Sequence, residues 1–461
     1  MSVMFWFDPA GSGRCGAPFA VAQVAVSAAG SDRNAMAFAN RNSPISPIPH
    51  AIVLCRTLTG LATVRALRRV GLSVQALVLA DRDLVRYTRL ARIVEVPPEA
   101  RHGEALIEFL LRLAPRADGD RPMLVPTSDE HALLLSEFAA TLDPHFRIWN
   151  NRFADLSHIV SKEHLYAIAE GLGLPTVPGI VEPTPEQLQA WSAVHAAPYL
   201  LKPFYVGVPR SSLQQKNQYF DTREALLDYV HRNGAQAVIV QRWINGGDGY
   251  VFDCYGLCDS AGHVVQMATH RRWRQNEPDC GATSFGEIPS GLPPERDDLL
   301  ITQTQTLLGG LRYHGIFGVE WLLERDTGRF YLIDFNARPF SSVGHLVDCG
   351  LNLPALAYRE LAGCLPPGLP LRPPLRHLWW IDIYRDLQTF RQLREAGRLG
   401  FRQWIVSTLR CRSWAYLDLR DPLPAIVCAK RLLRHLVDLA LSRSKRRAGR
   451  GGYPASQDAT T

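Results

Sequence analysis

Short apolar runs and amphipathic helix patterns alternate along residues 51–150. The runs AIVLC, SVQALVLA and MLVPT have the length and the β-branched content of buried strands. Between them, TVRALRRVG is a helix pattern closed by Gly71, and SDEHALLLSEFAATL is a helix pattern that opens on a serine cap. Because such alternation is typical of βαβ units, we predict a parallel, doubly wound α/β domain here. The segment RTLTGLA after the first strand is expected to be a turn, and it lacks the GxGxxG fingerprint of a dinucleotide site.

The middle of the chain carries apolar runs that are interrupted by single polar residues. Ser161 caps a helix pattern with Lys162 in its first turn, where the helix macrodipole favours an anion. The strand pattern PYLLKPF contains Lys202, which either reaches out to solvent or neutralises an anion. A third strand pattern, AVIVQRWINGG, runs out into two glycines before Asp248. We expect a long strand-rich stretch to follow it.

Two further apolar runs, GIFGVEWLLE and FYLIDFNARP, flank the polar loop RDTGR and predict a β-hairpin over residues 315–336. Side chains alternate between the faces of a strand, so Asn336 and Arg338 share a face with Asp334. The simplest register pairs Glu324 with Phe330, Leu322 with Leu332, and Glu320 with Asp334.

Glu320 and Asp334 would then repel each other, because directly paired Cβ atoms lie roughly 4.5–5.5 Å apart. A cation between them would remove the repulsion, and carboxylate and amide oxygens are the hard ligands that Mg²⁺ or Mn²⁺ prefers. The alternative is that this face of the hairpin is exposed to solvent and that the two carboxylates are simply hydrated.

Composition narrows the class of protein. Hydrophobic residues make up 46% of the 461 residues, and the net charge of +7 is concentrated in RSKRRAGR, residues 443–450. The remainder is near neutral, so we expect no nucleic-acid partner. The nine cysteines include no CxxC pair, which suits a reducing, cytoplasmic location. No run reaches the ~18 to 20 apolar residues that a spanning helix needs.

The two ends of the chain differ from the body. Residues 1–48 are rich in Ala, Ser, Asn and Pro, so we expect a disordered extension, with Met36 as an alternative start. The C-terminal region 371–442 is expected to be helical, and 443–461 a basic disordered tail. As a helix, residues 425–450 are basic and amphipathic. Such a helix either covers the body of the protein or makes a weak peripheral contact with a membrane.

Five motifs in order resemble those of ATP-grasp ligases. They are SK at 161–162, YLLKP at 199–203, VIVQRWINGGD at 238–248, GVEWLLE at 318–324 and LIDFNARP at 332–339. The resemblance is to the branch of carboxylate–amine ligases, related to the ATP-binding lobes of carbamoyl-phosphate synthase and to D-Ala–D-Ala ligases. HRRWRQNEPDCGATSFGE, residues 270–287, is similar to a further segment of that branch.

The resemblance implies a pre-ATP-grasp parallel α/β domain over 49–150. It further implies a two-lobed α+β ATP-grasp domain over 151–370 with a hinge near 241–248, and the helical C-terminal extension follows. The segment from Tyr205 to Asn217, polar and containing Gly and Pro, is expected to be a mobile lid.

The resemblance also implies roles for single residues in binding ATP. Lys162 and Lys202 would bind the phosphates, and Asp248 would reach the ribose. The adenine would be lined by Gln241, Arg242, Trp243 and Ile244, mostly through the backbone of Arg242 and Ile244. Gln241 stands where many ATP-grasp enzymes have Glu.

For the reaction itself, the resemblance implies that Glu320, Asp334 and Asn336 hold Mg²⁺ or Mn²⁺. Arg338 and Arg274 would neutralise the transferring phosphoryl group and the acyl phosphate. Gly318 stands where D-Ala–D-Ala ligases have an arginine, so that charge is expected from Arg338.

The function expected is transfer of the γ-phosphoryl group of ATP to a carboxylate, followed by attack of an amine, with release of ADP and phosphate. The partners would be a small-molecule carboxylate and an amine, with amino acids the first candidates, and the sequence does not indicate the oligomer. One alternative is a carboxylase acting on bicarbonate, although no Met-Lys-Met biotin-carrier motif is present. The other alternative is a degenerate protein that binds nucleotide without turnover.

Overall fold

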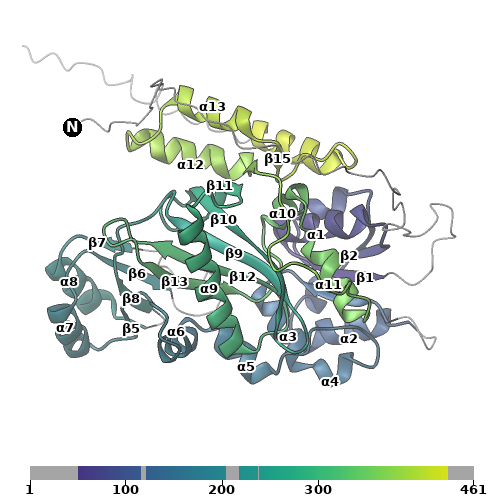
Figure 1. Cartoon of the computed structure of the whole chain (residues 1–461), viewed down its shortest axis with the longest axis horizontal. Coiled ribbons are helices and arrows are strands. Elements are labelled where there is room, and N and C mark those ends of the chain that lie inside the picture. Colours follow the sequence, from purple (N-terminus) through teal and green to yellow (C-terminus); the bar gives the residue numbers. More distant parts are fainter. Residues whose placement is uncertain (1–49, 116–120, 204–217, 237, 435–461) are drawn as a thin grey trace, which may run out of the picture. The chain divides into compact units, whose positions relative to one another are not determined.

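The computed structural model describes residues 50–115, 121–203, 218–236 and 238–434, which form three β-sheets and their covering helices (Figure 1). The expected N-terminal extension (1–48), the expected lid (205–217) and the basic tail (443–461) lie outside the described residues. None of the described helices combines the length and the apolar content needed to cross a bilayer.

The N-terminal domain is built on a parallel sheet in the order β3-β2-β1-β4, which confirms the predicted fold class for this region. One detail of the prediction is wrong, because the first helix begins at Thr57, inside the expected turn. A Cβ on Gly60 would lie 2.7 Å from the Cβ of Cys55, so this glycine allows a close approach of helix to strand. The elements are β1 (Ala51–Cys55), α1 (Thr57–Arg69), β2 (Val74–Val78), η1 (Leu84–Tyr87), β3 (Arg92–Glu95), η2 (Pro98–Ala100), α2 (Gly103–Leu113), β4 (Met123–Pro126), α3 (Asp129–Glu137) and α4 (Ala139–Leu142).

The smaller lobe contains a four-stranded antiparallel sheet in the order β5-β8-β6-β7. Leu188, Leu226 and Val240 are buried in one cluster, so the two helices α7 and α8 cover one face of this sheet. Two preceding helices connect the lobe to the N-terminal domain. The elements are α5 (Phe153–Val160), α6 (Lys162–Gly171), β5 (Gly179–Val181), α7 (Pro185–Val194), β6 (Tyr199–Pro203), β7 (Gln218–Phe220), α8 (Arg223–Asn233) and β8 (Val238–Arg242).

The larger lobe is a seven-stranded sheet in the order β13-β12-β9-β10-β11-β14-β15. The expected strand-rich stretch also contains a long helix, α9, whose buried Leu300, Thr304, Leu307 and Leu311 already stand at helical spacing in the sequence. The elements are β9 (Val251–Cys258), β10 (Val264–Asn276), β11 (Ala282–Ile288), α9 (Pro294–Leu311), β12 (Gly315–Leu323), β13 (Phe330–Asn336), α10 (Val343–Cys349), α11 (Leu353–Leu361), β14 (Leu378–Ile381), α12 (Ile383–Glu395), α13 (Phe401–Arg410) and β15 (Ser413–Trp414).

The C-terminal region is helical as expected in α12, α13 and a last helix over 423–434, but it also supplies two strands to the large sheet. β14 pairs with β11, and β15 pairs with β14. The apolar run around Trp379 and Trp380 is therefore part of the sheet.

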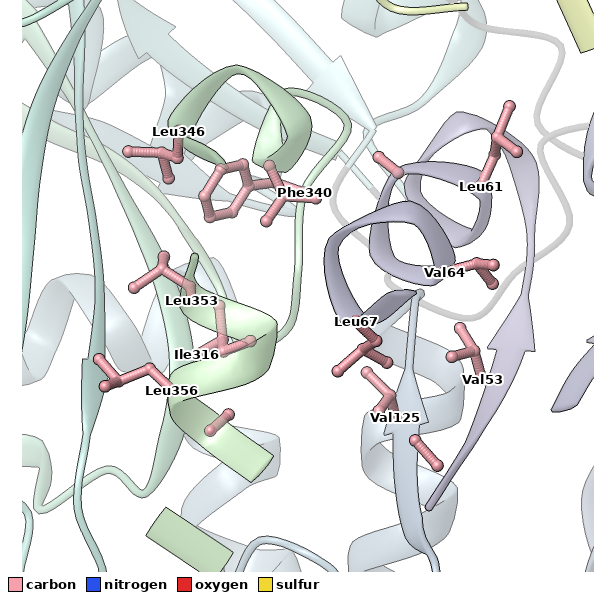
Figure 2. Close-up of a cluster of buried hydrophobic side chains, with 14 of the residues drawn as sticks. Val53, Leu61, Val64, Leu67, Val125, Ile316, Phe340, Leu346, Leu353 and Leu356 are labelled. Atoms are coloured by element: carbon pink, nitrogen blue, oxygen red, sulfur yellow. The ribbon is translucent and has the colours of Figure 1, made fainter. Parts of the chain in front are cut away.

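The two faces of the large sheet have different partners. Phe317, Val319 and Trp321 of β12 face α9, whereas Ile316 faces the N-terminal domain. Figure 2 shows this second core, in which side chains of α1, β1 and β4 meet those of β12, α10 and α11. Further along the same face of β12, the alternation of side chains brings Glu320 to the surface of the sheet.

Candidate active site

The hairpin of β12 and β13 places two acids opposite each other, as predicted. Glu320 pairs with Asp334, and Gly318 pairs with Asn336. Beyond this point the predicted register is wrong. The structure instead pairs Trp321 with Leu332, Leu322 with Tyr331, and Leu323 with Phe330.

The two registers differ because Ile333 is an extra residue in β13, a β-bulge. The carbonyl oxygen of Ile333 accepts hydrogen bonds from Lys162 Nζ at 3.1 Å and from the Tyr166 hydroxyl at 3.1 Å. Lys162 Nζ also lies 2.7 Å from Asp334 Oδ1. The bulge therefore fixes the first turns of α6 against the acidic end of β13.

A row of polar side chains crosses four strands on this face of the sheet. Glu320 stands opposite Asp253 of β9, and Asp253 stands opposite His270 of β10. Arg272 joins the row, since its Nη2 lies 2.5 Å from Asp253 Oδ1 and 2.6 Å from Glu320 Oε1. Burial would raise the pKa of Asp253, but Arg272 and the hydrogen bond with His270 lower it to about 2. Asp253 therefore stays ionised and holds the guanidinium beside Glu320.

Arg274, which the sequence assigned to the phosphoryl group, points elsewhere. It forms a bidentate ion pair with Asp386 of α12 at 2.8 and 2.9 Å, and it packs over the ring of Phe285. The register of β10 against β11 shifts on both sides of Arg274, with Trp273 as an extra residue. This bulge turns Arg272 and Arg274 to different surroundings, although they are two residues apart. The arginine beside the acidic pair is Arg272.

The two predicted phosphate-binding lysines lie close enough to influence each other. Burial, and then the positive charge of Lys162, lower the pKa of Lys202 to about 8. No ion pair holds Lys202 among the described residues. Burial also lowers the pKa of Lys162, but Asp334 outweighs this, so its pKa is raised overall. A second cation near Lys162 that has no ion pair within the described part of the chain indicates a place for an anion.

Glu320, Asp334 and Asn336 form a set of hard oxygen ligands at the end of the hairpin. Asn336 Nδ2 donates to Glu320 Oε1 at 2.9 Å, and Asp334 Oδ1 accepts from Lys162. Glu320 Oε2 and Asp334 Oδ2 have no partner from the part of the chain that the structure describes. No group of three His, Cys, Asp or Glu side chains suited to a metal occurs there either. Two free carboxylate oxygens with an amide nearby fit Mg²⁺, which keeps several water ligands.

The predicted adenine-binding strand lies at the junction of the two lobes. Gln241 is buried, and its Nε2 lies 3.4 Å from the Tyr166 hydroxyl, which links it to the lysine site. The N–H of Arg242 donates to Pro178 O, and the N–H of Trp243 donates to Pro198 O. The backbone N–H of Ile244 has no acceptor among the described residues. Of the two backbone groups predicted to bind adenine, at Arg242 and Ile244, only the N–H of Ile244 therefore lacks an acceptor among the described residues and can donate to the base.

Asp248 lies in a turn that packs against the loop between β10 and β11. Its Oδ1 accepts from Gln275 Nε2 at 3.2 Å and from the N–H of Asp279 at 3.2 Å. A Cβ on Gly247, which has φ of +85°, would collide with Asp279. Burial, and then the charge of Asp279, raise the pKa of Asp248 to about 6. Asp248 Oδ2 is buried without a hydrogen-bond partner among the described residues, so it can still accept a hydroxyl.

Arg338 connects the site to the N-terminal domain. It forms two contacts with Asp129, the first residue of α3, at 3.0 Å each. Asp129 follows Ser128, whose side chain caps α3 by accepting from the N–H of His131. The predicted phosphoryl-neutralising arginine is thus held by a carboxylate at the carboxyl end of β4.

The structure therefore brings four of the predicted residues together: Lys162, Glu320, Asp334 and Asn336. Lys202 lies close enough for the charge of Lys162 to lower its pKa. Arg274 lies apart from this group. Sequence reasoning missed Arg272, Asp253 and Tyr166. Asp253 carried a usable signal, since it is a single acid inside the apolar run VFDCYGLC, just as Glu320 is in its own run. Arg272 carried none, because the bulge is not visible in the sequence.

No family model matches the sequence. Solved structures do share its fold. The ADP complex of purK, an N5-carboxyaminoimidazole ribonucleotide synthetase, is 17% identical with a TM-score of 0.58, covering 76% of this chain and 86% of that one. An L-amino acid ligase from Bacillus licheniformis is 16% identical with a TM-score of 0.53, covering 71% of this chain and 82% of the ligase.

A third similar structure is the biotin carboxylase domain of the Hydrogenobacter thermophilus 2-oxoglutarate carboxylase, in complex with MgADP, ADP and bicarbonate. It is 16% identical with a TM-score of 0.56, covering 72% of this chain and 74% of that one. These likenesses confirm the predicted architecture, a parallel α/β domain followed by a two-lobed α+β domain.

Proposed function

We propose that this chain, which has the ATP-grasp fold, is an ATP-dependent carboxylate–amine ligase. In this reaction a carboxylate oxygen attacks the γ-phosphorus of ATP, the bond to the β-phosphate oxygen breaks, and ADP leaves. The amine nitrogen then attacks the acyl phosphate, and inorganic phosphate leaves as the amide forms.

One observation carries the proposal. One end of the β12–β13 hairpin brings together five polar side chains, with contacts of 2.6 to 3.1 Å that link them to one another and to the bulge: Lys162, Arg272, Glu320, Asp334 and Asn336. Paired carboxylates and cations in this arrangement suit a polyphosphate and its metal, because phosphoryl transfer depends chiefly on positioning and charge. A purely structural role would not require two carboxylate oxygens that have no partner among the residues described in the structure.

Each residue has a separate task in the proposal. Lys162 and Lys202 bind the phosphates, and Lys202 is the one that has no ion pair with any described residue. Mg²⁺, held by Glu320, Asp334 and Asn336, would neutralise charge on the phosphate oxygens. Arg272 positions Glu320 from the side of β10.

Substrate activation is assigned to Arg338. Its guanidinium contacts both carboxylate oxygens of Asp129, and an incoming carboxylate presents the same planar, bidentate partner. The carboxyl ends of β1 and β4, where the strand order of the parallel sheet changes direction, lie on this side as well. Amino acids are the first substrates to test, in line with the B. licheniformis ligase of similar fold.

The products test the reaction class. With the correct carboxylate and amine, ADP and phosphate should form in equal amounts, and neither substrate alone should give the full rate. Glu320→Gln serves as the inactive control. Formation of AMP and pyrophosphate would eliminate the acyl-phosphate mechanism. If the rate of phosphate release does not change with any carboxylate or amine tried, the result would instead favour a protein that binds nucleotide without coupled turnover.

A second candidate is carboxylation by bicarbonate, because two of the similar structures are an N5-carboxyaminoimidazole ribonucleotide synthetase and a biotin carboxylase. Bicarbonate would then take the place of the organic carboxylate as phosphoryl acceptor. ADP formation that depends on bicarbonate and persists without any other carboxylate distinguishes this candidate from the ligase.

A further inference from the structure

Exposed apolar side chains concentrate in the C-terminal region of the described chain. Of the twelve large hydrophobic side chains that are exposed among the described residues, seven lie between 401 and 433. Single exposed apolar residues are ordinary, but a cluster on one region marks an interaction site. The seven are Phe401, Val406, Leu409, Leu417, Leu419, Ile426 and Leu433.

Helix α13 has an inner and an outer face of different character. On the inner face, Trp404 is buried, stacks on Phe390 with ring centroids 4.7 Å apart, and donates its Nε1–H to Asp386 at 2.8 Å. The outer face carries Arg402, Val406, Leu409 and Arg410, which are all exposed and follow the i, i+4, i+7, i+8 spacing of one helical stripe.

The last described helix, residues 423–434, repeats the pattern. Ile426, Lys430, Leu433 and Arg434 are exposed at the same i, i+4, i+7, i+8 spacing. This helix is held to the body by its other side, where Arg431 donates to the carbonyl oxygen of Arg82 at 2.7 Å. Both helices lie along the edge drawn uppermost in Figure 1.

The charge of this region is strongly positive. Between 392 and 434 the only exposed acidic residue is Glu395. The exposed basic residues there are Arg394, Arg398, Arg402, Arg410, Arg412, Arg420, Lys430 and Arg434. The sequence continues beyond the described residues into RSKRRAGR, which adds five basic residues and no acidic one.

We propose that the outer faces of α13 and of the 423–434 helix form a docking surface for an anionic lipid bilayer. Such a surface accepts apolar side chains into the acyl boundary and the long basic side chains among the headgroups. A second copy of the chain would bring two strongly positive surfaces together, and a nucleic acid would leave the apolar side chains unused. The mixed stripe fits the bilayer best.

Vesicle sedimentation with the full chain tests this surface. The chain should sediment at low salt with phosphatidylcholine vesicles containing about one third phosphatidylserine, and it should stay in solution with pure phosphatidylcholine. The double variant Val406→Glu with Leu409→Glu should lose at least about tenfold in binding, because it places acids in the stripe. Both side chains are exposed, 43% and 69%, so the fold should survive.

The matched control is Val194→Glu with Leu299→Glu, which changes two other exposed apolar residues outside the docking surface. The control should bind vesicles like the wild type, and a chain ending at Arg434 should keep part of the binding. Thermal melts confirm that all variants fold.

Several results would overturn the proposal. They are no binding to the mixed vesicles, unchanged binding by the V406E/L409E variant, and an equal loss by the control. Complete loss of binding on deletion of residues 435–461 would assign the contact to that segment instead. A wild-type dimer that V406E/L409E makes monomeric, without vesicle binding, would identify a second copy as the occupant.

Discussion

Arg272 and Arg274 make the same kind of contact in different places. Each is buried and pairs bidentately with an aspartate, but only Arg272 also contacts Glu320. Lysine cannot reproduce the planar fork of arginine, so both Arg→Lys variants should lose about 1–3 kcal/mol of stability. Under the proposed function, Arg272→Lys should also lower ADP formation at least about 100-fold, whereas Arg274→Lys should stay within about threefold. Equal losses of activity in the two variants would contradict the assignment of Arg272 to the site.

The acidic pair gives a second prediction. Asp334→Asn and Glu320→Gln should fold and lose nucleotide turnover, because each removes a ligand of the proposed metal. Relief of like-charge repulsion alone predicts that the stability of the apoprotein stays unchanged or rises slightly. The structure shows each acid already paired with a cation, Asp334 with Lys162 and Glu320 with Arg272. Asp334→Asn should therefore cost about 1 kcal/mol, which a thermal melt with and without MgATP can measure. Wild-type turnover in both variants would remove the metal site.

Lys202 should couple nucleotide binding to the uptake of a proton. Its pKa of about 8 lies below the ordinary value of 10.5 because burial and Lys162 disfavour its charge. Between these pH values the folded apoprotein binds fewer protons here than the unfolded chain, so this group's contribution to stability rises with pH across that window. Phosphate groups beside Lys202 would restore its charge. Calorimetry at pH 8.5 in buffers of different ionisation enthalpy should then detect proton uptake on ADP binding.

Lys202→Arg is the control for this prediction, because arginine stays charged in both states. The variant should bind ADP without the proton uptake. Uptake of equal size in Lys202→Arg would mean that another group titrates.

At the scale of single elements, the pattern of apolar and polar residues predicted most strands and the pairing of Glu320 with Asp334. It could not predict the bulges at Ile333 and Trp273, because one extra residue shifts register without changing the local composition. The bulge at Ile333 determines which carbonyl oxygen accepts from Lys162, and the bulge at Trp273 determines which arginine contacts Glu320. The errors at residue scale therefore come from two local irregularities of the strands.

The C-terminal elements are expected to be required for folding. The sequence suggested that a domain ends near residue 370, but β14 pairs with β11, and Asp386 of α12 neutralises the buried Arg274. A chain ending at residue 370 would lose both side-chain partners of Arg274, Asp386 and Ser407. It would also expose the apolar side of Phe285 and leave β11 as an edge strand, unpaired on that side. It should be insoluble or melt at much lower temperature, whereas a chain ending at Arg434 should melt within a few degrees of the full chain. Equal melting of both truncated chains would restore the boundary at 370.

At the scale of the whole molecule, the order of the five motifs predicted the architecture, while the contacts between distant segments were not predictable. The core shared by α1, α10 and α11 joins residues nearly 300 positions apart, such as Leu61 and Leu353. The pair of Arg338 and Asp129 joins residues 209 positions apart in the chain. Local patterns specify strands and helices, but which ends of them meet depends on packing over the whole chain.

The Arg338–Asp129 pair allows the chemical role of Arg338 to be separated from its structural one. If Arg338 receives the carboxylate and neutralises the phosphoryl group, Arg338→Ala should lower substrate-dependent ADP formation at least about 100-fold while ADP binding stays unchanged. Asp129→Asn breaks the same ion pair but keeps the guanidinium, so it should keep most of the activity. A lower KM for the substrate carboxylate is expected in this variant. The side chain at position 129 competes with the substrate for Arg338, and in Asp129→Asn it carries no charge. If both variants lose activity equally and both have a lower melting temperature, the role of Arg338 is structural, namely its ion pair with the N-terminal domain. The positive charge for phosphoryl transfer must then come from Arg272 and the two lysines.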